Sequence, residues 1–177
     1  MILIFRYSVH KRVYSNGLKL LHEVPGTIKK ENFFMAVPHS FKFQYKNKTC
    51  YVTGSVDSML DYSLEYIYPM EKEIELRIFR STHFFNTRKA IDEKTFSKFY
   101  RFISEKKYIY DLLVSEKKVF EALLQMLQDF DQILFGKDNS CRLITRYNSF
   151  LIKPNKILST FHNIKILADF LENNLDG

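Results

Sequence analysis

Glycine, proline, cysteine and tryptophan are all scarce in this chain. Its 177 residues include five Gly, four Pro, two Cys and no Trp. So little Gly and Pro excludes a collagen-like, mucin-like or linker-dominated chain, and two Cys cannot form a disulfide framework. Apolar side chains are plentiful, because 46% of the residues are hydrophobic and 16% are aromatic. A chain of this size and composition is expected to form one soluble globular domain, 1–177, that buries about 70% of its unfolded surface.

Long apolar runs are also missing. The first five residues are apolar, but Arg6 ends the run, short of the roughly 7 to 15 apolar residues in the core of a signal peptide. No other run approaches the roughly 20 residues that span a bilayer. We therefore expect no export signal, no transmembrane segment and a cytoplasmic location. In that reducing compartment, Cys50 and Cys141 are expected to be buried free thiols.

The patterns that carry catalysis, metal binding or phosphate binding do not occur. No two of the five histidines have the roughly three- to five-residue spacing that places two metal ligands on one helical face. The five glycines stand singly, so there is no Walker or dinucleotide fingerprint, and no Ser lies in a Gly-x-Ser-x-Gly elbow. The sequence thus predicts no catalytic residue, no metal ligand and no cofactor.

The first half of the chain has the patterns of an antiparallel sheet. Residues 40–45 alternate aromatic with polar side chains, the period of a strand with one buried face. A polar turn at 46–48 follows, and further strand patterns cover 49–56, 61–68 and 74–80. We expect these four runs to form a meander. Before them, residues 2–14 fit a strand, and residues 18–24 fit a strand or one helical turn.

After about residue 90 the apolar side chains recur every three or four residues, which is typical of helices. Helices are predicted at 92–104 after a cap at Asp92, at about 115–136 ending at Gly136, and at about 159–173. Residues 108–114 fit either a short strand or a helical extension. Runs at 141–147 and 150–153 flank Asn148 and Ser149, which favours a second hairpin.

Strands followed by helices predict an α+β fold rather than a strict β-α alternation. We expect an antiparallel sheet, made of an N-terminal meander plus a C-terminal hairpin, covered on one face by about three helices. Two weakly separable parts are the alternative, with 1–88 mainly β and 89–177 mainly α with a hairpin.

Positive charge is concentrated at the N-terminal end. The formal net charge is +7, and residues 1–50 hold nine basic and two acidic residues, so the rest of the chain is neutral. A positive first quarter suits nucleic acid, an anionic membrane surface or an acidic protein. The bases are dispersed rather than massed in one run, which also fits a solvated surface.

Basic and aromatic residues are interleaved on two predicted strands, at 41–46 and 77–80. Exposed aromatics on a sheet can stack nucleic-acid bases while Lys and Arg contact phosphates. The candidate nucleic-acid-binding residues are Lys42, Lys46, Lys48, Arg77 and Arg80. The alternative is that the aromatics form the core face of the sheet and the bases are solvated.

These absences favour a non-enzymatic domain that acts by binding another protein. A nucleic-acid-binding module that uses the basic N-terminal quarter is the alternative. A third hypothesis is an enzyme whose site is assembled from residues distant in the sequence.

Overall fold

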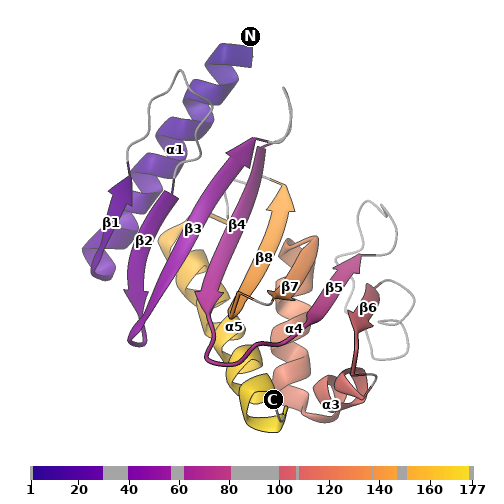
Figure 1. The fold of residues 1–177 in the computed structure, drawn as a ribbon. Coiled ribbons are helices and arrows are strands. Elements are labelled where there is room, and N and C mark those ends of the chain that lie inside the picture. Colours follow the sequence, from indigo (N-terminus) through magenta and orange to yellow (C-terminus); the bar gives the residue numbers. More distant parts are fainter. Residues whose placement is uncertain are drawn as a thin grey trace.

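The fold is seen in a computed structural model that describes residues 2–29, 40–56, 62–80, 100–106, 108–136, 138–146 and 151–175. In chain order, the elements labelled in Figure 1 are α1 (Ile2–Glu23), β1 (Gly26–Lys29), β2 (Ser40–Tyr45), β3 (Lys48–Val56), β4 (Tyr62–Pro69), β5 (Leu76–Arg80), β6 (Tyr100–Ser104), α3 (Ile109–Ser115), α4 (Lys117–Asp129), β7 (Gln132–Gly136), β8 (Ser140–Arg146) and α5 (Pro154–Asn174).

The strands form one antiparallel sheet in the order β1-β2-β3-β4-β8-β7-β5-β6 (Figure 1). β1 to β4 follow chain order as a meander, and the later hairpin β7–β8 lies between β4 and β5. This confirms an α+β fold with an N-terminal meander and a C-terminal hairpin in one sheet. The last predicted strand leaves the meander, since β5 pairs with β6 and β7 and the hairpin takes the place beside β4.

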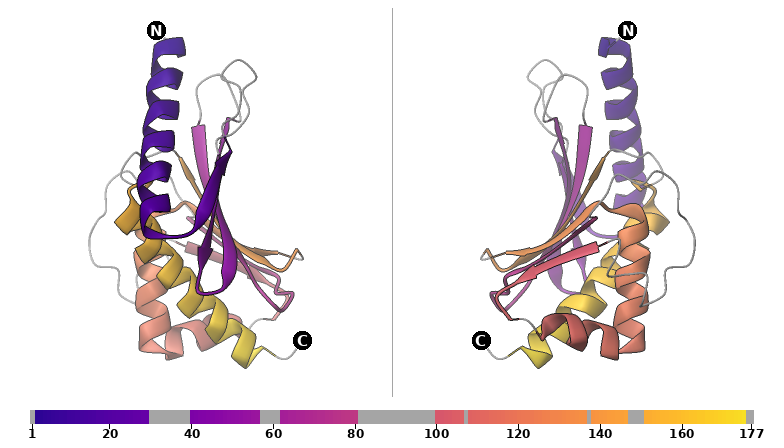
Figure 2. Two further views of the ribbon diagram at one scale, coloured as in Figure 1. Left: turned by 90° about the vertical axis from the view of Figure 1, so that its left-hand side faces the viewer. Right: turned by 90° about the vertical axis from the view of Figure 1, so that its right-hand side faces the viewer.

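Helices cover one face of this sheet. In Figure 2, α1, α4 and α5 lie on the same side of the strands, and the described residues place no helix on the other side. Side chains alternate accordingly, because along β2 Phe41 and Phe43 are buried while Lys42 and Gln44 are exposed. We call the two sides the helix face and the open face.

An aromatic cluster fills the space between the helix face and the helices. Phe161 of α5 packs edge-on against Phe43 of β2 with ring centroids 5.1 Å apart. Tyr66 of β4 packs in the same way against Phe130, at 5.0 Å. Each of these four side chains is at most 1% exposed. The core therefore joins the meander to the C-terminal helices.

Two of the predicted helices are confirmed, with different ends. α5 starts at Pro154 rather than at 159, since Pro is favoured in the first turn of a helix. α4 stops at Asp129 rather than at 136, because Phe130 is already extended and Asp131 donates its N–H to the Ile144 carbonyl at 3.0 Å. Residues 132–136 are strand β7, in which alternate side chains are buried.

The N-terminal prediction is wrong at 2–14, which is helical and forms more than half of α1. Residues 18–23 continue this helix, in keeping with the helical alternative for that segment. α1 contacts β1 and α5, and Gly17 and Leu20 within it are buried. Burial against distant elements decides the conformation here, because a short apolar run fits a strand and a helix equally well.

Two predictions in the second half also need correction. Of the helix expected at 92–104, residues 100–104 are strand β6, paired with β5, and residues 92–99 lie outside the described part. The strand at 141–147 is found as β8, but its partners are β7 and β4, and residues 151–153 form no strand. Non-local pairing overrides the local turn signal in this region. The ambiguous residues 108–114 are helical, within α3 and its start.

Among the described helices, none has both the length and the apolar character that crossing a membrane requires.

Candidate functional site

The five basic residues proposed from the sequence do not share one surface. Lys42 on β2 and Arg77 on β5 are exposed on the open face, five strand spacings apart, or about 24 Å. Lys46 belongs to the β2–β3 turn and Lys48 begins β3, and both line a cleft beside α5. Arg80 ends β5, and its side chain is outside what the structure describes.

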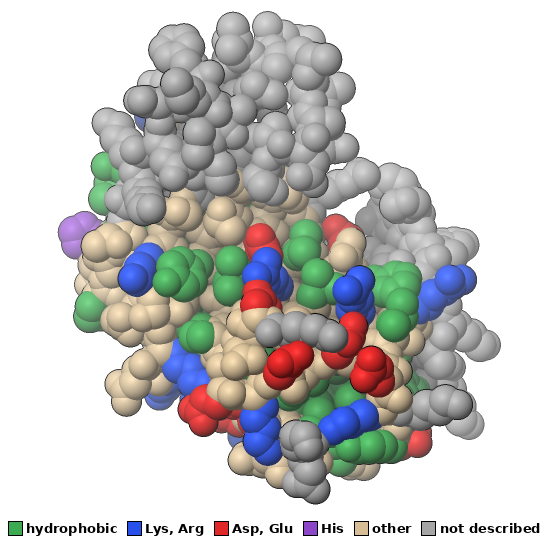
Figure 3. All heavy atoms as spheres, in the orientation of Figure 1, with side chains coloured by type: hydrophobic (Ala, Val, Ile, Leu, Met, Phe, Trp, Pro, Cys, Tyr) green, Lys and Arg blue, Asp and Glu red, His purple; other side chains and the backbone are tan. Residues whose placement is uncertain are grey.

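One straight row of directly paired residues crosses the open face. The cross-strand row consists of Lys42, Tyr51, Ile67, Arg142, Leu134, Arg77 and Ile103. Side chains directly opposite one another on an antiparallel sheet are close enough to interact. Figure 3 shows the result as a band of blue and green side chains with red ones among them. Basic and apolar groups therefore meet repeatedly on this face.

Some cations of the cross-strand row are already engaged. The Nζ of Lys42 lies 5.9 Å from the centroid of the Tyr51 ring, a cation–π distance. Arg142 forms ion pairs with Glu65, at 3.4 Å, and with Asp138. The centre of the open face is therefore close to neutral.

The β5–β6 end of the open face differs from its centre. Arg77 is paired with Ile103 across the strands, and Phe79 is paired with Arg101. Both arginines are exposed, Ile103 is 55% exposed, and Phe79 is half-buried. Neither arginine has an ion-pair partner within the described residues. We call these four residues the basic–apolar patch.

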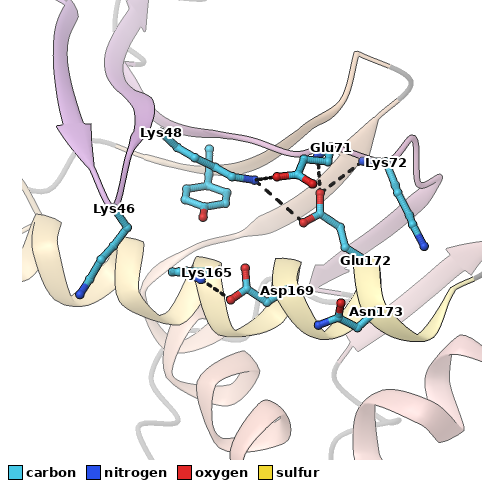
Figure 4. Close-up of a pocket in the computed structure, with 9 residues that line it drawn as sticks. Lys46, Lys48, Glu71, Lys72, Lys165, Asp169, Glu172 and Asn173 are labelled. Carbon is cyan, nitrogen blue, oxygen red and sulfur yellow. Dashed lines mark hydrogen bonds and ion pairs between the residues drawn. The ribbon is translucent and has the colours of Figure 1, made fainter.

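A cleft of about 490 Å³ opens between the β2–β3 turn, the segment after β4 and the C-terminal half of α5 (Figure 4). Its lining is almost entirely polar: Lys46, Lys48, Tyr68, Glu71, Lys72, Lys165, Asp169, Glu172 and Asn173. We call it the Tyr68 cleft.

Glu172 links α5 to the segment after β4, at one side of the Tyr68 cleft. Its carboxylate accepts the backbone N–H of Glu71 and, at 3.3 Å, that of Lys72. The Nζ of Lys48 lies 3.7 Å from a Glu71 oxygen and 4.0 Å from a Glu172 oxygen. Figure 4 shows Lys48, Glu71 and Glu172 converging from β3, the loop after β4, and α5. Both Lys48 distances are longer than a hydrogen bond.

The hydroxyl of Tyr68 is the unusual group in this cleft. The Tyr68 side chain is 0% exposed, and its oxygen has no hydrogen-bond partner within the described residues. The Lys48 Nζ lies 5.3 Å from the centroid of its ring. Burial, followed by the nearby Asp169 carboxylate, raises the pKa of Tyr68. The phenol is therefore protonated at neutral pH, and its O–H is an unused buried donor.

Lys46, in the β2–β3 turn, has a strained backbone conformation. Lys46 has φ 49° and Asn47 has φ 66°, so both central residues of this two-residue hairpin turn are left-handed, as a type I′ turn requires. Asn and Gly tolerate this conformation, whereas for other residues a left-handed backbone costs roughly 1–3 kcal/mol. The exposed Lys46 has no ion-pair partner in the described part of the chain.

A pair of tyrosines on β4 provides a direct test of the Tyr68 geometry. Tyr66 donates to the Leu151 carbonyl, whereas the Tyr68 hydroxyl has no acceptor. Tyr66→Phe should lower the free energy of unfolding by about 1–3 kcal/mol, because a buried hydrogen bond is lost. Tyr68→Phe should leave stability unchanged or raise it by up to about 1 kcal/mol. Urea unfolding measures both, and equal losses would contradict the unpaired hydroxyl.

The two cysteines offer no alternative reactive centre. Cys50 and Cys141 are free and buried. Burial raises the pKa of Cys50 to about 12 and also raises that of Cys141, so neither thiol is a ready nucleophile. Within the described residues, no group of three His, Cys, Asp or Glu side chains could hold a metal ion.

Lys46 and Lys48 were predicted from the sequence, but the other residues of the Tyr68 cleft were not. Glu172 is 101 residues from Glu71, and no local pattern connects them. The one available signal was Lys46-Asn47 in a short hairpin turn, where a lysine is unfavourable. Tyr68 looked like any other residue of an alternating strand.

Comparisons with known proteins add no assignment to this geometry. No protein-family model matches the chain, and neither a curated protein nor a solved structure shows significant similarity to it.

Proposed function

We propose that the protein is a non-enzymatic binding module that holds another protein against the open face of its sheet, at the basic–apolar patch. The observation that carries this proposal is that two exposed arginines, which form no ion pair with any described residue, lie opposite exposed or half-buried apolar side chains on neighbouring strands. Arginine and aromatic residues are enriched in protein interfaces and often dominate their binding energy. The cytoplasm is the compartment we expect, since two free thiols suit a reducing environment.

The patch also indicates the chemistry of the partner. The guanidinium groups of Arg77 and Arg101 can each bind a carboxylate of the partner through two hydrogen bonds. Ile103 lies opposite Arg77, and Phe79 lies opposite Arg101, so basic and apolar side chains alternate. We expect the two apolar side chains to contact apolar groups of the partner. The expected partner is therefore a protein surface that alternates acidic and apolar side chains.

The distribution of charge supports a protein rather than a nucleic acid. Tracking a phosphate backbone requires a continuous positive groove, but the central Arg142 is paired with two acids and Lys42 is about 24 Å from Arg77. The basic N-terminal quarter is also divided. Lys46 and Lys48 line the Tyr68 cleft, whereas Lys19 is exposed on α1.

Reversing the charges of the patch tests the proposal. The tagged protein and the double variant Arg77→Glu/Arg101→Glu are purified from nuclease-treated native host extract, and the recovered partner is titrated against both by calorimetry. We expect an acidic partner whose affinity falls about 100-fold or more in the variant, because interface arginines often contribute about 2 kcal/mol each. Replacing acidic residues of the partner by Lys should restore part of the loss.

The matched control is Arg12→Glu/Lys118→Glu, which makes the same change in net charge at exposed positions on α1 and α4. It should bind the partner as the unmodified protein does. If the two double variants behaved alike, net charge rather than the basic–apolar patch would govern binding.

Nucleic-acid binding remains the second candidate because Lys42 lies over the ring of Tyr51 on the open face. A real site should bind RNA or DNA below the micromolar range at about 150 mM salt, with steep salt dependence. We expect only the weak, non-specific binding of about 10⁻⁴ to 10⁻⁶ M. Tight binding that is abolished by Lys42→Glu/Arg77→Glu would favour nucleic acid over a protein partner.

A further inference from the structure

We propose that the Tyr68 cleft binds a small molecule through one oxyanion group, a carboxylate or a phosphate. The cleft lies beside the C-terminal half of α5 and shares no residue with the basic–apolar patch. This second binding site is therefore independent of protein docking at the patch. Its volume of about 490 Å³ falls within the range of small-molecule sites.

The Tyr68 hydroxyl is a buried donor without an acceptor among the described residues. A buried polar group without a hydrogen bond is costly, and nearly all such groups in native proteins have a partner. The phenol lines the cleft, is fully buried and is protonated at neutral pH. It therefore has a proton to donate, and a ligand oxygen in the cleft is a suitable acceptor.

Unused hydrogen-bond donors outnumber unused acceptors in the Tyr68 cleft. Two of the three carboxylates are already used, because Asp169 pairs with Lys165 and Glu172 accepts two backbone N–H groups. The Nζ of Lys72 is also engaged, since it donates to the Leu175 carbonyl at 2.9 Å. Lys46 has no ion pair among the described residues, and Lys48 approaches its carboxylates only at 3.7 and 4.0 Å. Free donors therefore exceed free acceptors, which favours an oxyanion over a cation.

The charges that line the Tyr68 cleft limit the charge of the ligand. Four lysines and three carboxylates line the cleft, so its formal surplus is one positive charge. A second anionic group would meet Asp169 and Glu172 without a compensating cation. The expected ligand carries a single oxyanion, held by Tyr68, Lys46 and Lys48, and a neutral polar remainder.

The strain at Lys46 agrees with this assignment. A glycine or asparagine at this left-handed position would relax the turn. A lysine there places its ammonium group at the mouth of the cleft but destabilises the turn. Such a destabilising residue is expected at a functional site. In Figure 4, Lys46 extends from the turn alongside α5.

Titrations with two simple probes test the site. Inorganic phosphate and acetate are added separately to the ¹⁵N-labelled protein, and sodium chloride of equal ionic strength serves as the reference. We expect at least one probe to give saturable amide shifts at Lys46, Lys48 and Tyr68. Which probe binds more tightly identifies the oxyanion.

Two variants and their controls assign the contacts. Tyr68→Phe should weaken binding about tenfold, since hydrogen bonds to charged groups are the stronger ones, and Lys46→Gly should weaken it severalfold. Asn47→Gly relaxes the same turn but keeps Lys46, and it should bind normally, as should Lys117→Ala on α4. Arg77→Glu/Arg101→Glu should also bind normally, so this site can fail or succeed separately from the proposed docking function.

Shifts that never saturate beyond the chloride reference, or normal binding by Tyr68→Phe, would refute the site.

Discussion

Leu123→Asp is expected to leave the protein unfolded at 25 °C. Leu123 and Leu127 are both 0% exposed on α4, one turn apart. Truncating a buried leucine alone costs about 2–5 kcal/mol, and an unpaired buried carboxylate adds several kcal/mol more. Together these losses are comparable to the roughly 5–15 kcal/mol by which a typical domain is stable. Leu127→Asp should behave in the same way.

Far-UV circular dichroism and thermal melting measure this effect. Lys117→Ala is the control on the same helix, since it removes only an exposed ion pair with Glu121 at 3.9 Å, which contributes about 0–1 kcal/mol. A cooperative melt for Leu123→Asp within a few degrees of that control would mean that α4 does not present this face to the core.

Phe161→Ala is expected to lower the free energy of unfolding by about 3–5 kcal/mol. Phe161 is 0% exposed, and its ring centroid lies 5.1 Å from that of Phe43 and 5.6 Å from that of Tyr66. Removing the ring therefore leaves a cavity between α5 and strands β2 and β4. Edge-to-face contacts worth about 0.5–1.5 kcal/mol each are lost as well.

Chemical denaturation of the variant gives this loss directly. His162→Ala is the matched control, because His162 is the next residue of α5 and is exposed. It should change stability by less than about 0.5 kcal/mol. A loss below 1 kcal/mol for Phe161→Ala would show that α5 does not anchor the meander.

Two local conflicts with stability coincide in the Tyr68 cleft. Lys46 occupies a left-handed turn position, and the buried Tyr68 hydroxyl lacks a hydrogen bond. Local sequence preferences agree with the fold at most positions of a protein, and the exceptions are expected mainly at functional sites. The basic–apolar patch shows no comparable strain, which is consistent with a surface that gains its energy only when a partner covers it.

Elements with repeated local patterns were predictable. The alternation at 40–45 and 49–56 identified β2 and β3, and the three- and four-residue period identified α4 and α5. Each pattern extends over enough residues to separate a period of two from one of 3.6. α1, β1, β6 and β7 were missed, because a short run has no distinct period and takes the conformation that its distant neighbours allow.

The candidate sites were predictable only in part. Arg77 belongs to the basic–apolar patch, and Lys46 and Lys48 belong to the Tyr68 cleft, so three of the five proposed basic residues lie in one of the two sites. A nucleic-acid platform would need them on one surface, whereas Arg77 lies on the open face and Lys46 and Lys48 line the cleft beside α5. Arg101 and Glu172 carried no local signal.

Composition and periodicity alone determined the α+β class, the meander and the main apolar stripes, because these properties depend on neighbours within one strand or helix. Only the tertiary structure decided that β7 and β8 enter the sheet between β4 and β5. That insertion brings Arg142 and Leu134 into the same row as Lys42 and Arg77. Likewise, only the packing of α5 against the β2–β3 turn and the segment after β4 creates the Tyr68 cleft. Pairings between residues this far apart depend on the whole chain folding together, so no local pattern encodes them.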